Sequence, residues 1–217
     1  MEKEYKEIHF EEIDSTNKYI KEHHSELTNL TFVRADFQSA GRGRYDRQWI
    51  SEKGESLLFS FLLKDEDVVR KAGYLSFVAA SSVVRTLYKF ATLNHVFDSK
   101  WVSIKWPNDI YVRDQKLCGM LIENRLKGSV IKDSIIGIGL NVNQLCFKSD
   151  VPNPVSLANL TGRMYDMEAL LQKLLAVFDA EWTDLDGVRS RYLSQLYRRK
   201  GFHRYRDASG EFSAELM

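Results

Sequence analysis

The sequence predicts an α+β (α/β) fold, in which a mixed, mostly antiparallel sheet has long helices packed on one face. An apolar run at 55–63 has both of its faces covered, as in the interior of a sheet. Two long alternating segments flank the turn Lys127-Gly128-Ser129 and predict a hairpin over 116–142. The segments 65–90 and 167–182 repeat apolar residues with the period of a helix, and they predict the covering layer. The other face of the sheet is then open to a binding site.

The composition fits one medium-sized domain with a real core: 217 residues, 44% of them hydrophobic. The net charge of +1 gives no global field that would attract nucleic acid or a membrane. No apolar run is long enough to span a bilayer, and the N-terminus leads into no apolar signal segment. We therefore expect a cytoplasmic protein without a membrane partner. Cys118 and Cys146 lie in apolar surroundings and are expected to be buried free thiols.

The first third of the chain alternates strands with helices. Residues 8–13 and 31–36 read as strands, and the polar run at 14–17 offers N-caps for the helix between them. The long helix predicted over 65–90 contains Gly73, which weakens it locally and suggests a close crossing with another element.

The middle of the chain is rich in strands. Pro107 cannot donate to a ladder, so 102–112 is predicted as strand, break and strand. On the return strand, Ile136, Ile138, Leu140 and Val142 face one way, while Ile135, Gly137, Gly139 and Asn141 face the other. Glycine inside a strand often marks close approach of a ligand or of another backbone. This strand alone is equally compatible with a ligand floor and with a helix packed closely over the glycines.

The last third is mainly helical. A short helix at 156–162 should end at Gly162, Asp166 should cap the helix over 167–182, and a surface helix is expected over 188–199. Residues 202–216 read as strand, turn and strand.

A loop with unusual chemistry joins the strands at 31–36 and 55–63. Residues 38–49 read Gln-Ser-Ala-Gly-Arg-Gly-Arg-Tyr-Asp-Arg-Gln-Trp. Arginine offers forked donors for carboxylate and phosphate, glycine lets a ligand approach the backbone, and tryptophan offers a stacking face. The loop suits an acidic, nucleotide-bearing ligand. A solvated basic loop and an RNA-binding Gly-Arg segment remain alternatives at this point.

Five motifs in order resemble the catalytic domain of the biotin protein ligases (biotin–[acetyl-CoA-carboxylase] ligases) from about residue 8 to the end. They are Ser15-Thr16-Asn17, Gly41-Arg42-Gly43-Arg44 with Arg47 and Trp49, Lys105-Trp106-Pro107-Asn108-Asp109, Lys116-Leu117-Cys118-Gly119 and Gly137-Ile138-Gly139-Leu140-Asn141-Val142. The resemblance implies a class II synthetase-like biotin/lipoate ligase fold. It implies a catalytic domain over 1–200, and over 201–217 the beginning of a truncated SH3-like β domain.

The family makes biotinyl-5′-AMP and pyrophosphate from biotin and ATP with Mg²⁺, then moves biotin to a lysine of a biotin carboxyl carrier protein domain. The resemblance thus implies biotin, ATP and Mg²⁺ as ligands. The implied partner is the carrier domain of acetyl-CoA carboxylase or of a related carboxylase. Because no helix-turn-helix domain precedes residue 8, no DNA binding is expected. The expected state is a monomer or a weak homodimer.

The resemblance also implies roles for residues. Lys116, Arg42 and Arg44 would neutralise the approaching carboxylate and α-phosphate. The biotin-binding positions would be Ser15, Thr16, Asn17, Gln38, Gly41, Arg42, Gly43, Arg44, Lys116 and Gly119. The nucleotide-binding positions would be Arg44, Trp49, Asn108, Asp109, Lys116 and Asn141. No metal ligand is certain, and Asp109 is the position that would contact Mg²⁺ bound with ATP. No residue is identified as the general base of the transfer step.

Strand alternation makes one further prediction: Lys116 and Gly119 should lie on opposite faces, so that Gly119 would reach a ligand only through its backbone.

There are two alternatives, the second of them from a different functional class. A lipoate–protein ligase or octanoyltransferase shares the fold, but Ser15-Thr16-Asn17 and Gln38 suit a ureido head that lipoate lacks. A non-enzymatic ligand- or RNA-binding module would use the arginine–glycine loop and leave Lys116 and the glycine-containing strand without a shared purpose.

Overall fold

The computed structural model describes residues 5–64, 72–94, 98–148, 153–207 and 209–216. Its main feature is a seven-stranded sheet with strand order β1-β2-β3-β7-β6-β5-β4. Only the β1–β2 pair is parallel among its described strands, so the prediction of a mixed, mostly antiparallel sheet is confirmed. The strands are β1 (Lys6–Ile13), β2 (Thr31–Gln38), β3 (Ser56–Leu63), β4 (Val102–Lys105), β5 (Asp109–Val112), β6 (Gln115–Lys127) and β7 (Val130–Asn141).

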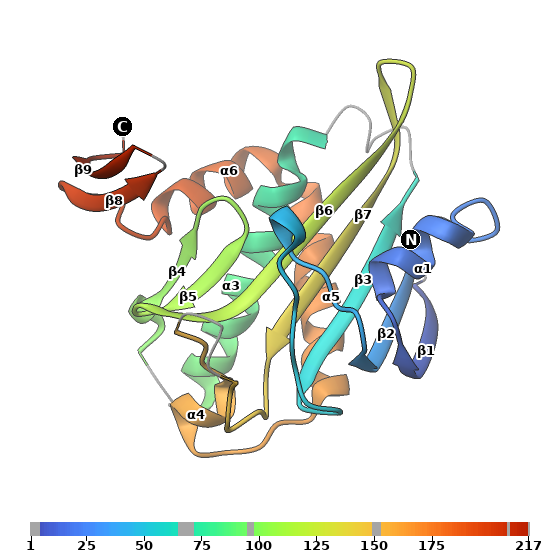
Figure 1. The fold of residues 1–217 in the computed structure, drawn as a ribbon, viewed down its shortest axis with the longest axis horizontal. Helices are drawn as coiled ribbons and strands as arrows, with labels where there is room; N and C mark the ends of the chain where they lie inside the picture. Colours follow the sequence, from blue (N-terminus) through green and yellow to red (C-terminus); the bar gives the residue numbers. More distant parts are fainter. Residues whose placement is uncertain (1–4, 65–71, 95–97, 149–152, 208, 217) are drawn as a thin grey trace.

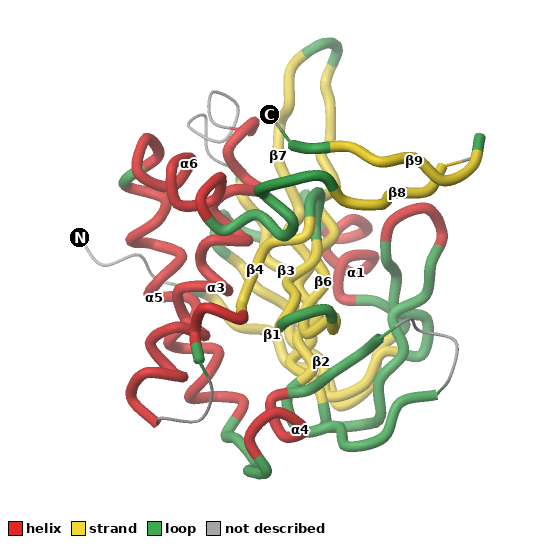
Figure 2. Tube along the Cα trace, turned by 90° about the vertical axis from the view of Figure 1, so that its left-hand side faces the viewer, coloured by secondary structure: helices red, strands yellow, loops and turns green. Residues whose placement is uncertain are grey.

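Helices cover the two faces of the sheet unequally. The long helices α3 (Leu75–Asn94) and α5 (Met167–Thr183) lie behind the sheet in Figure 1, with α6 (Leu185–Ser194) beside them. The side view in Figure 2 shows these helices as one layer, the strands as a second, and α1 with the long loops on the far side. The helix α1 comprises Thr16–His23, and the short α4 comprises Leu157–Thr161.

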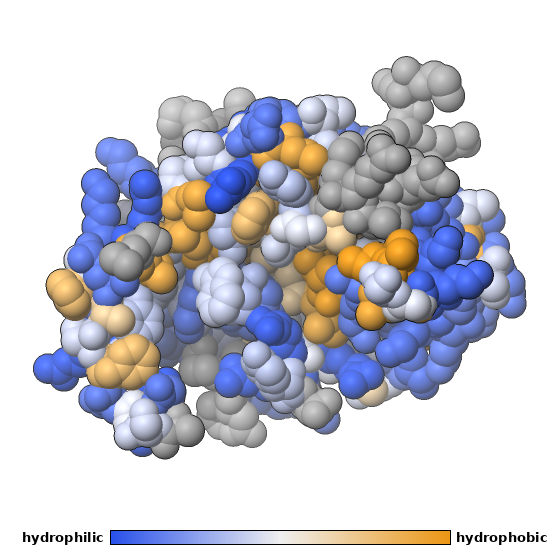
Figure 3. Space-filling view, turned by 90° about the horizontal axis from the view of Figure 1, so that it is seen from above, coloured by the Kyte–Doolittle hydropathy of each residue, from blue (hydrophilic) through white to orange (hydrophobic). Residues whose placement is uncertain are grey.

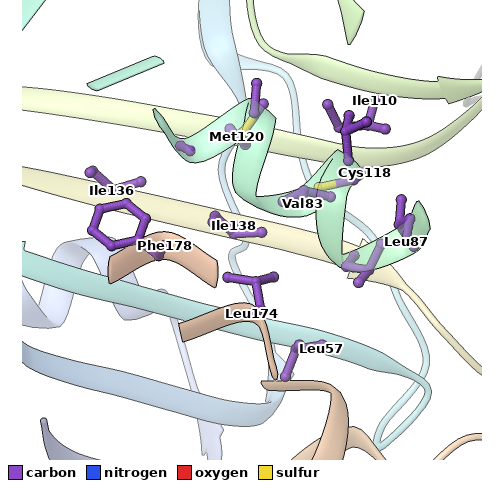
Figure 4. Close-up of a cluster of buried hydrophobic side chains, with 14 of the residues drawn as sticks. Leu57, Val83, Leu87, Ile110, Cys118, Met120, Ile136, Ile138, Leu174 and Phe178 are labelled. Carbon is purple, nitrogen blue, oxygen red and sulfur yellow. The ribbon is translucent and has the colours of Figure 1, made fainter. Parts of the chain in front are cut away.

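The main core lies between the sheet and α3 and α5. Alternation along β3 sends Leu57, Phe59 and Phe61 into this core, and the ring of Phe61 meets that of Phe178 at 4.6 Å. Figure 4 shows side chains of α3, α5 and the strands meeting there: Leu57, Val83, Leu87, Ile110, Cys118, Met120, Ile136, Ile138, Leu174 and Phe178. On the other face, α1 packs through a smaller cluster of Ile20, Leu27, Val33, Leu62 and Ile135.

The end of the chain forms a separate two-stranded sheet of β8 (His203–Asp207) and β9 (Gly210–Ala214), as the hairpin pattern predicts. Figure 1 shows it standing apart from the main sheet, beyond α6. Its Tyr205 and Phe212 rings stack at 5.8 Å. That 201–217 begins a second domain stays a prediction.

Two helix boundaries differ from the prediction. Part of the segment predicted as a helix over 65–90 lies outside the described residues. In the described part the α-helix begins at Leu75, after a 3-10 turn over Ala72–Tyr74. The close crossing expected at Gly73 is not found among the described residues: apart from its chain neighbours, none of their atoms lies within 4 Å of where its Cβ would be.

The helix predicted over 188–199 is α6, which begins and ends earlier. Asp184 caps it by accepting a hydrogen bond from Gly187 N at 3.1 Å. After Ser194 the backbone pairs with strand β4 instead: Ile104 N donates to Gln195 O at 2.8 Å, and Tyr197 N donates to Ile104 O at 2.8 Å. Pairing with an edge strand therefore ends the helix.

The two cysteines differ in their exposure to solvent. Cys118 is buried in the main core, and burial raises the pKa of its thiol. Cys146 is exposed, so the prediction that it is buried is wrong: its apolar neighbours belong to a loop after β7, not to a strand.

Seen from above, hydrophobic side chains reach the surface in separate patches among hydrophilic ones (Figure 3). Within the described part of the chain, no helix is long and apolar enough to cross a membrane.

Candidate active site

The first part of the site lies where β1 and β2 end side by side. Their parallel pairing places Ile13 opposite Gln38, so the turn after β1 meets the end of β2. Ser15 caps α1, with its side chain accepting from Lys18 N at 3.4 Å. The Thr16 backbone N–H donates to Gln38 Oε1 at 2.8 Å. The first residue of α1 therefore contacts Gln38 through both its backbone N–H and its side chain.

A chain of hydrogen bonds extends from this corner across the sheet. Thr16 Oγ1 lies 2.6 Å from Ser60 Oγ on β3, and Ser60 Oγ donates to Asn17 Oδ1 at 2.5 Å. Asn17 Nδ2 donates to Glu123 Oε2 on β6 at 2.9 Å. We call Thr16, Asn17, Gln38, Ser60 and Glu123 the polar cluster. Its members come from four elements, α1, β2, β3 and β6.

The two glycines of β7 each make room for a side chain of the site. A Cβ on Gly137 would lie 2.1 Å from Asn17 Oδ1, and a Cβ on Gly139 would lie 2.6 Å from Cε2 of Trp49. Both spacings are far below van der Waals contact, so neither position accepts a larger residue without movement. Of the two alternatives left open by the sequence, close helix packing is confirmed at Gly137, which lies under Asn17 of α1. At Gly139 the loop tryptophan lies on the strand, and the ligand floor stays a prediction.

The loop after β2 brings Trp49 over the sheet, and in Figure 1 this loop crosses in front of the strands. The loop is closed on itself: Gly43 N donates to Arg47 O at 2.7 Å, and Trp49 N donates to Gly41 O at 2.9 Å. A Cβ on Gly41 would lie 2.6 Å from Trp49 O, so a glycine is needed for this close pairing. The indole then rests on Gly119 and Gly139, which are partners in the β6–β7 register.

Lys116 reaches the same side of the sheet as Gly119, which contradicts the prediction from strand alternation. A Cβ on Gly119 would lie 3.2 Å from Lys116 Nζ. The reason is a register shift between β5 and β6: Ile110 pairs with Cys118, whereas the next residue, Tyr111, pairs with Lys116. The extra residue, Leu117, turns inward beside Cys118, and both are buried. A bulge of this kind reverses the parity of the strand.

Three of the predicted site residues in this part of the site are cations: Lys116, Arg44 and Arg42. Lys116 Nζ lies 2.8 Å from Asp109 Oδ1 and 5.7 Å from the centroid of the Trp49 ring. Arg44 lies against the exposed ring of Tyr45, with its guanidinium 4.8 Å from the ring centroid. Arg42, on the same loop, is exposed. We call Arg42, Arg44 and Lys116 the cationic end.

These groups line one cavity of about 740 Å³. Of the predicted positions it contains Ser15, Thr16, Asn17, Gln38, Arg42, Gly43, Arg44, Trp49, Asn108, Asp109, Lys116 and Gly119. Gly41 and Asn141 lie outside its lining. Gly41 supports the loop, and Asn141 is buried with its Nδ2 donating to Val155 O at 3.1 Å. The nucleotide contact expected of Asn141 stays a prediction.

Sequence reasoning missed Ser60 and Glu123. Ser60 breaks the apolar run of β3 as its one polar residue between Leu58 and Leu62, on the face that carries the glycine positions of β7. That polar interruption is a usable signal. Glu123 gives none, because an acidic residue near the end of a long strand usually faces water.

A family model described as the biotin/lipoate A/B protein ligase family matches residues 9–141, more than half of the chain. The chain belongs to this family. The bifunctional ligase/repressor BirA of Bacillus subtilis (strain 168) is 33% identical over 159 residues, covering 71% of this chain and 46% of that protein. The biotin–[acetyl-CoA-carboxylase] ligase of Paracoccus denitrificans is 30% identical over 194 residues, covering 85% of this chain and 78% of that protein.

Comparison with solved structures shows the same fold. The biotin protein ligase from Aquifex aeolicus in complex with biotin and ATP superposes with a TM-score of 0.78 at 27% identity, covering 97% of this chain and 86% of that one. The predicted fold of this biotin/lipoate ligase family member is therefore confirmed. The chain spans about half the length of the bifunctional ligase/repressors that it matches.

Proposed function

We propose that this chain is the catalytic part of a biotin–protein ligase. It would activate biotin with ATP to biotinyl-5′-AMP, releasing pyrophosphate, and transfer the biotinyl group to a lysine of a biotin carboxyl carrier protein domain. The observation that supports this proposal most strongly is that one cavity is lined by the uncharged side chains of the polar cluster (Thr16, Asn17, Gln38 and Ser60) and by the cationic end.

The spacing of the two ends suits a molecule with a polar head, an apolar tail and a carboxylate. Asn17 lies over Gly137, whereas Trp49 and Lys116 lie over the Gly119–Gly139 pair. Gly137 and Gly139 are two residues apart along β7, about 6–7 Å in a strand. The ureido head would bind at the polar cluster, the tail would pass the indole of Trp49, and the carboxylate would reach Lys116.

In the first step, a carboxylate oxygen attacks the α-phosphorus of ATP and pyrophosphate leaves. Both reactants are anionic, so fixed cations are needed where negative charge develops. Lys116 from strand β6, with Arg42 and Arg44 from the loop, would neutralise this charge. Trp49 and Asn108 would contact the nucleotide, and the indole also limits the access of water to the anhydride.

Mg²⁺ would enter as part of the substrate MgATP. Within the described residues no group of three or more His, Cys, Asp or Glu side chains is arranged to hold a metal ion. Asp109 is the acidic residue among the lining positions, and Lys116 already pairs with it. This donor set fits an ion held mainly by phosphate oxygens and water.

In the second step, the neutral amine of the carrier lysine attacks the carbonyl carbon of the adenylate, and AMP leaves. A lysine is mostly protonated at neutral pH, with a pKa of about 10.4, so the amine must lose its proton before it attacks. The substrate, the carrier partner and the two-step mechanism are all part of the proposal.

ATP–pyrophosphate exchange tests the first step. Exchange should require biotin and should not occur with lipoate, because the polar cluster matches a ureido head. Exchange with lipoate alone would overturn the proposal in favour of a lipoate ligase. Transfer is tested with a purified carrier domain and radiolabelled biotin, with the Lys→Arg variant of the acceptor lysine as the control.

A further inference from the structure

We propose that Ser60 and Glu123 are positioning residues that hold the Asn17 side-chain amide in one orientation, with its oxygen available to the ligand. The inference rests on the proposed function and deepens it, because it assigns specificity to two residues that the motifs do not contain. The donors and acceptors within the polar cluster determine this orientation.

The first step concerns the hydroxyl groups. Thr16 Oγ1 has one proton and two acceptors in reach, Gln38 Oε1 at 3.0 Å and Ser60 Oγ at 2.6 Å. Ser60 Oγ in turn lies 2.5 Å from Asn17 Oδ1, an atom that can only accept. The Ser60 proton therefore goes to Asn17, and the Ser60 oxygen is left to accept from Thr16. Ser60 is fully buried, so water does not compete for these bonds.

The second step concerns the amide nitrogen of Asn17. Its two protons go to Glu123 Oε2 at 2.9 Å and to Leu121 O at 3.4 Å. An amide nitrogen has no further proton to give, whereas the amide oxygen can accept a second hydrogen bond. Toward a ligand, Asn17 is therefore an acceptor and not a donor.

The third step concerns the alternative orientation. Rotating the amide by 180° would place its nitrogen against Ser60 and its oxygen against the carboxylate of Glu123. Two acceptors would then face each other at the distance of a hydrogen bond, which is strongly unfavourable in a buried site. Glu123 thus selects the orientation, and Ser60 stabilises it from the other side. The missing side chain of Gly137 leaves the space in which the amide lies.

The inferred specificity is for a ligand that offers an N–H to Asn17. A ureido ring has two N–H groups, and a cyclic carbamate analogue of biotin replaces one of them by oxygen. Of the two carbamate isomers, the one that turns its ring oxygen to Asn17 should bind much more weakly, because two acceptors would meet.

The experiment measures calorimetric affinities of the full chain for biotin and for both carbamate isomers. In Ser60→Ala and Glu123→Leu, affinity for biotin should fall about tenfold, the loss expected for one hydrogen bond. In Glu123→Leu the difference in affinity between biotin and the disfavoured isomer should narrow, since the amide is then free to turn, whereas in Ser60→Ala, where Glu123 still holds the amide, it should persist. Glu123→Gln keeps an acceptor for Asn17 and should recover most of the affinity.

Two matched variants separate positioning from general stability. Lys21→Ala removes the other partner of Glu123, which lies 3.4 Å from it, without touching Asn17. Ser82→Ala removes an equally buried hydroxyl that bonds only within α3. Both should bind like the wild type, and KM for ATP should be unchanged in all variants.

Three results would be decisive. Unchanged selectivity between biotin and the carbamate isomers in Glu123→Leu would overturn the positioning role, even if affinity falls. Equal biotin affinity in Ser60→Ala and wild type would also overturn it. A wild-type protein that binds no biotin would instead reject the proposed function itself.

Discussion

The two ends of the cavity are built in different ways. At the polar cluster, each side chain is held by partners on other elements, and Thr16, Asn17 and Ser60 are buried. At the cationic end, Arg42 and Arg44 belong to a loop closed by its own backbone hydrogen bonds, and Arg42 is exposed. One end has its geometry fixed by side-chain partners from several elements, whereas the other places two arginines on a loop, within reach of an anion.

Because the two ends are built differently, we expect one to select the ligand and the other to promote the reaction. A fixed set of donors and acceptors discriminates between ligands, because a wrong ligand leaves a buried group unpaired. Cations held where negative charge develops act on the transition state more than on the bound ground state. We therefore expect substitutions at the polar cluster to weaken binding and substitutions at the cationic end to slow the adenylation step.

The largest effect is expected for Lys116→Met. Removing a charge aimed at the developing negative charge should lower adenylate formation by about 10²–10³, or about 3–4 kcal/mol. The lysine pairs with Asp109, and their side chains are 25% and 19% exposed, so Asp109 keeps some access to water. Stability should change by less than about 1 kcal/mol. Pyrophosphate exchange and thermal unfolding measure the two effects.

Lys127→Met is the matched control, since Lys127 ends the same strand but lies outside the cavity lining. It should exchange pyrophosphate like the wild type. A Lys116→Met protein that did the same would remove Lys116 from the mechanism and leave the arginines as the active cations.

The next largest effect is expected for Gly139→Ala, at the position on β7 where the indole of Trp49 lies. Gly139→Ala would place a methyl group 2.6 Å from Trp49 Cε2, so the indole must move. Overpacking of this kind costs about 1–3 kcal/mol. Adenylate formation should fall because the indole lies beside Lys116, whereas biotin affinity should fall less. Gly73→Ala, at an open position, is the control for the pyrophosphate-exchange and calorimetric measurements. Equal activity in the two variants would show that the indole is not needed on the glycine pair.

A smaller effect is expected for Gln38→Ala at the polar cluster. The substitution removes the acceptor of Thr16 N and the proposed contact with the ureido head, so biotin affinity should fall about tenfold. ATP affinity measured without biotin should not change. If calorimetry shows the two affinities falling together, Gln38 does not belong to the end that binds the ureido head.

From the sequence, the side chains on the helix-covered face of the sheet are predicted more accurately than those on the face that carries the site. Alternation along β3 and β7 correctly assigns the residues that enter the main core, because burial on a regular strand depends only on parity. The same rule is wrong at Lys116, where one bulge reverses parity. A bulge depends on the pairing of two strands, and the sequence of one strand does not show it.

The site also contains residues that no motif marks. Ser60 and Glu123 come from strands that are distant in sequence, and only the β3–β7–β6 pairing brings them to Asn17. Conversely, the motif position Asn141 is buried against Val155 O, outside the cavity lining. Motif position predicts which strand carries a site residue, but the fold decides which side chains meet.

The smallest effect is expected on the order of the loop at 39–48. Arg42 and Arg47 are exposed there, so trypsin should cut the free protein after arginine. In the proposed binding mode, biotin would bring one carboxylate to the loop, whereas biotinyl-5′-AMP would also bring a phosphate. Protection measured by mass spectrometry should therefore increase from free protein to biotin to adenylate. Cleavage after Arg113, an exposed residue outside the cavity lining, is the internal control.

Variants at the two ends should change the protection of the loop from trypsin in different ways. In Arg44→Gln, biotin should still bind, because the polar cluster is intact, but the additional protection by the adenylate should be lost. In Gln38→Ala, saturating adenylate should still protect the loop, because the charges that hold it remain. Equal cleavage of the wild-type loop with and without the adenylate would show that the cationic end is as fixed as the polar cluster, and the contrast between the two ends would fail.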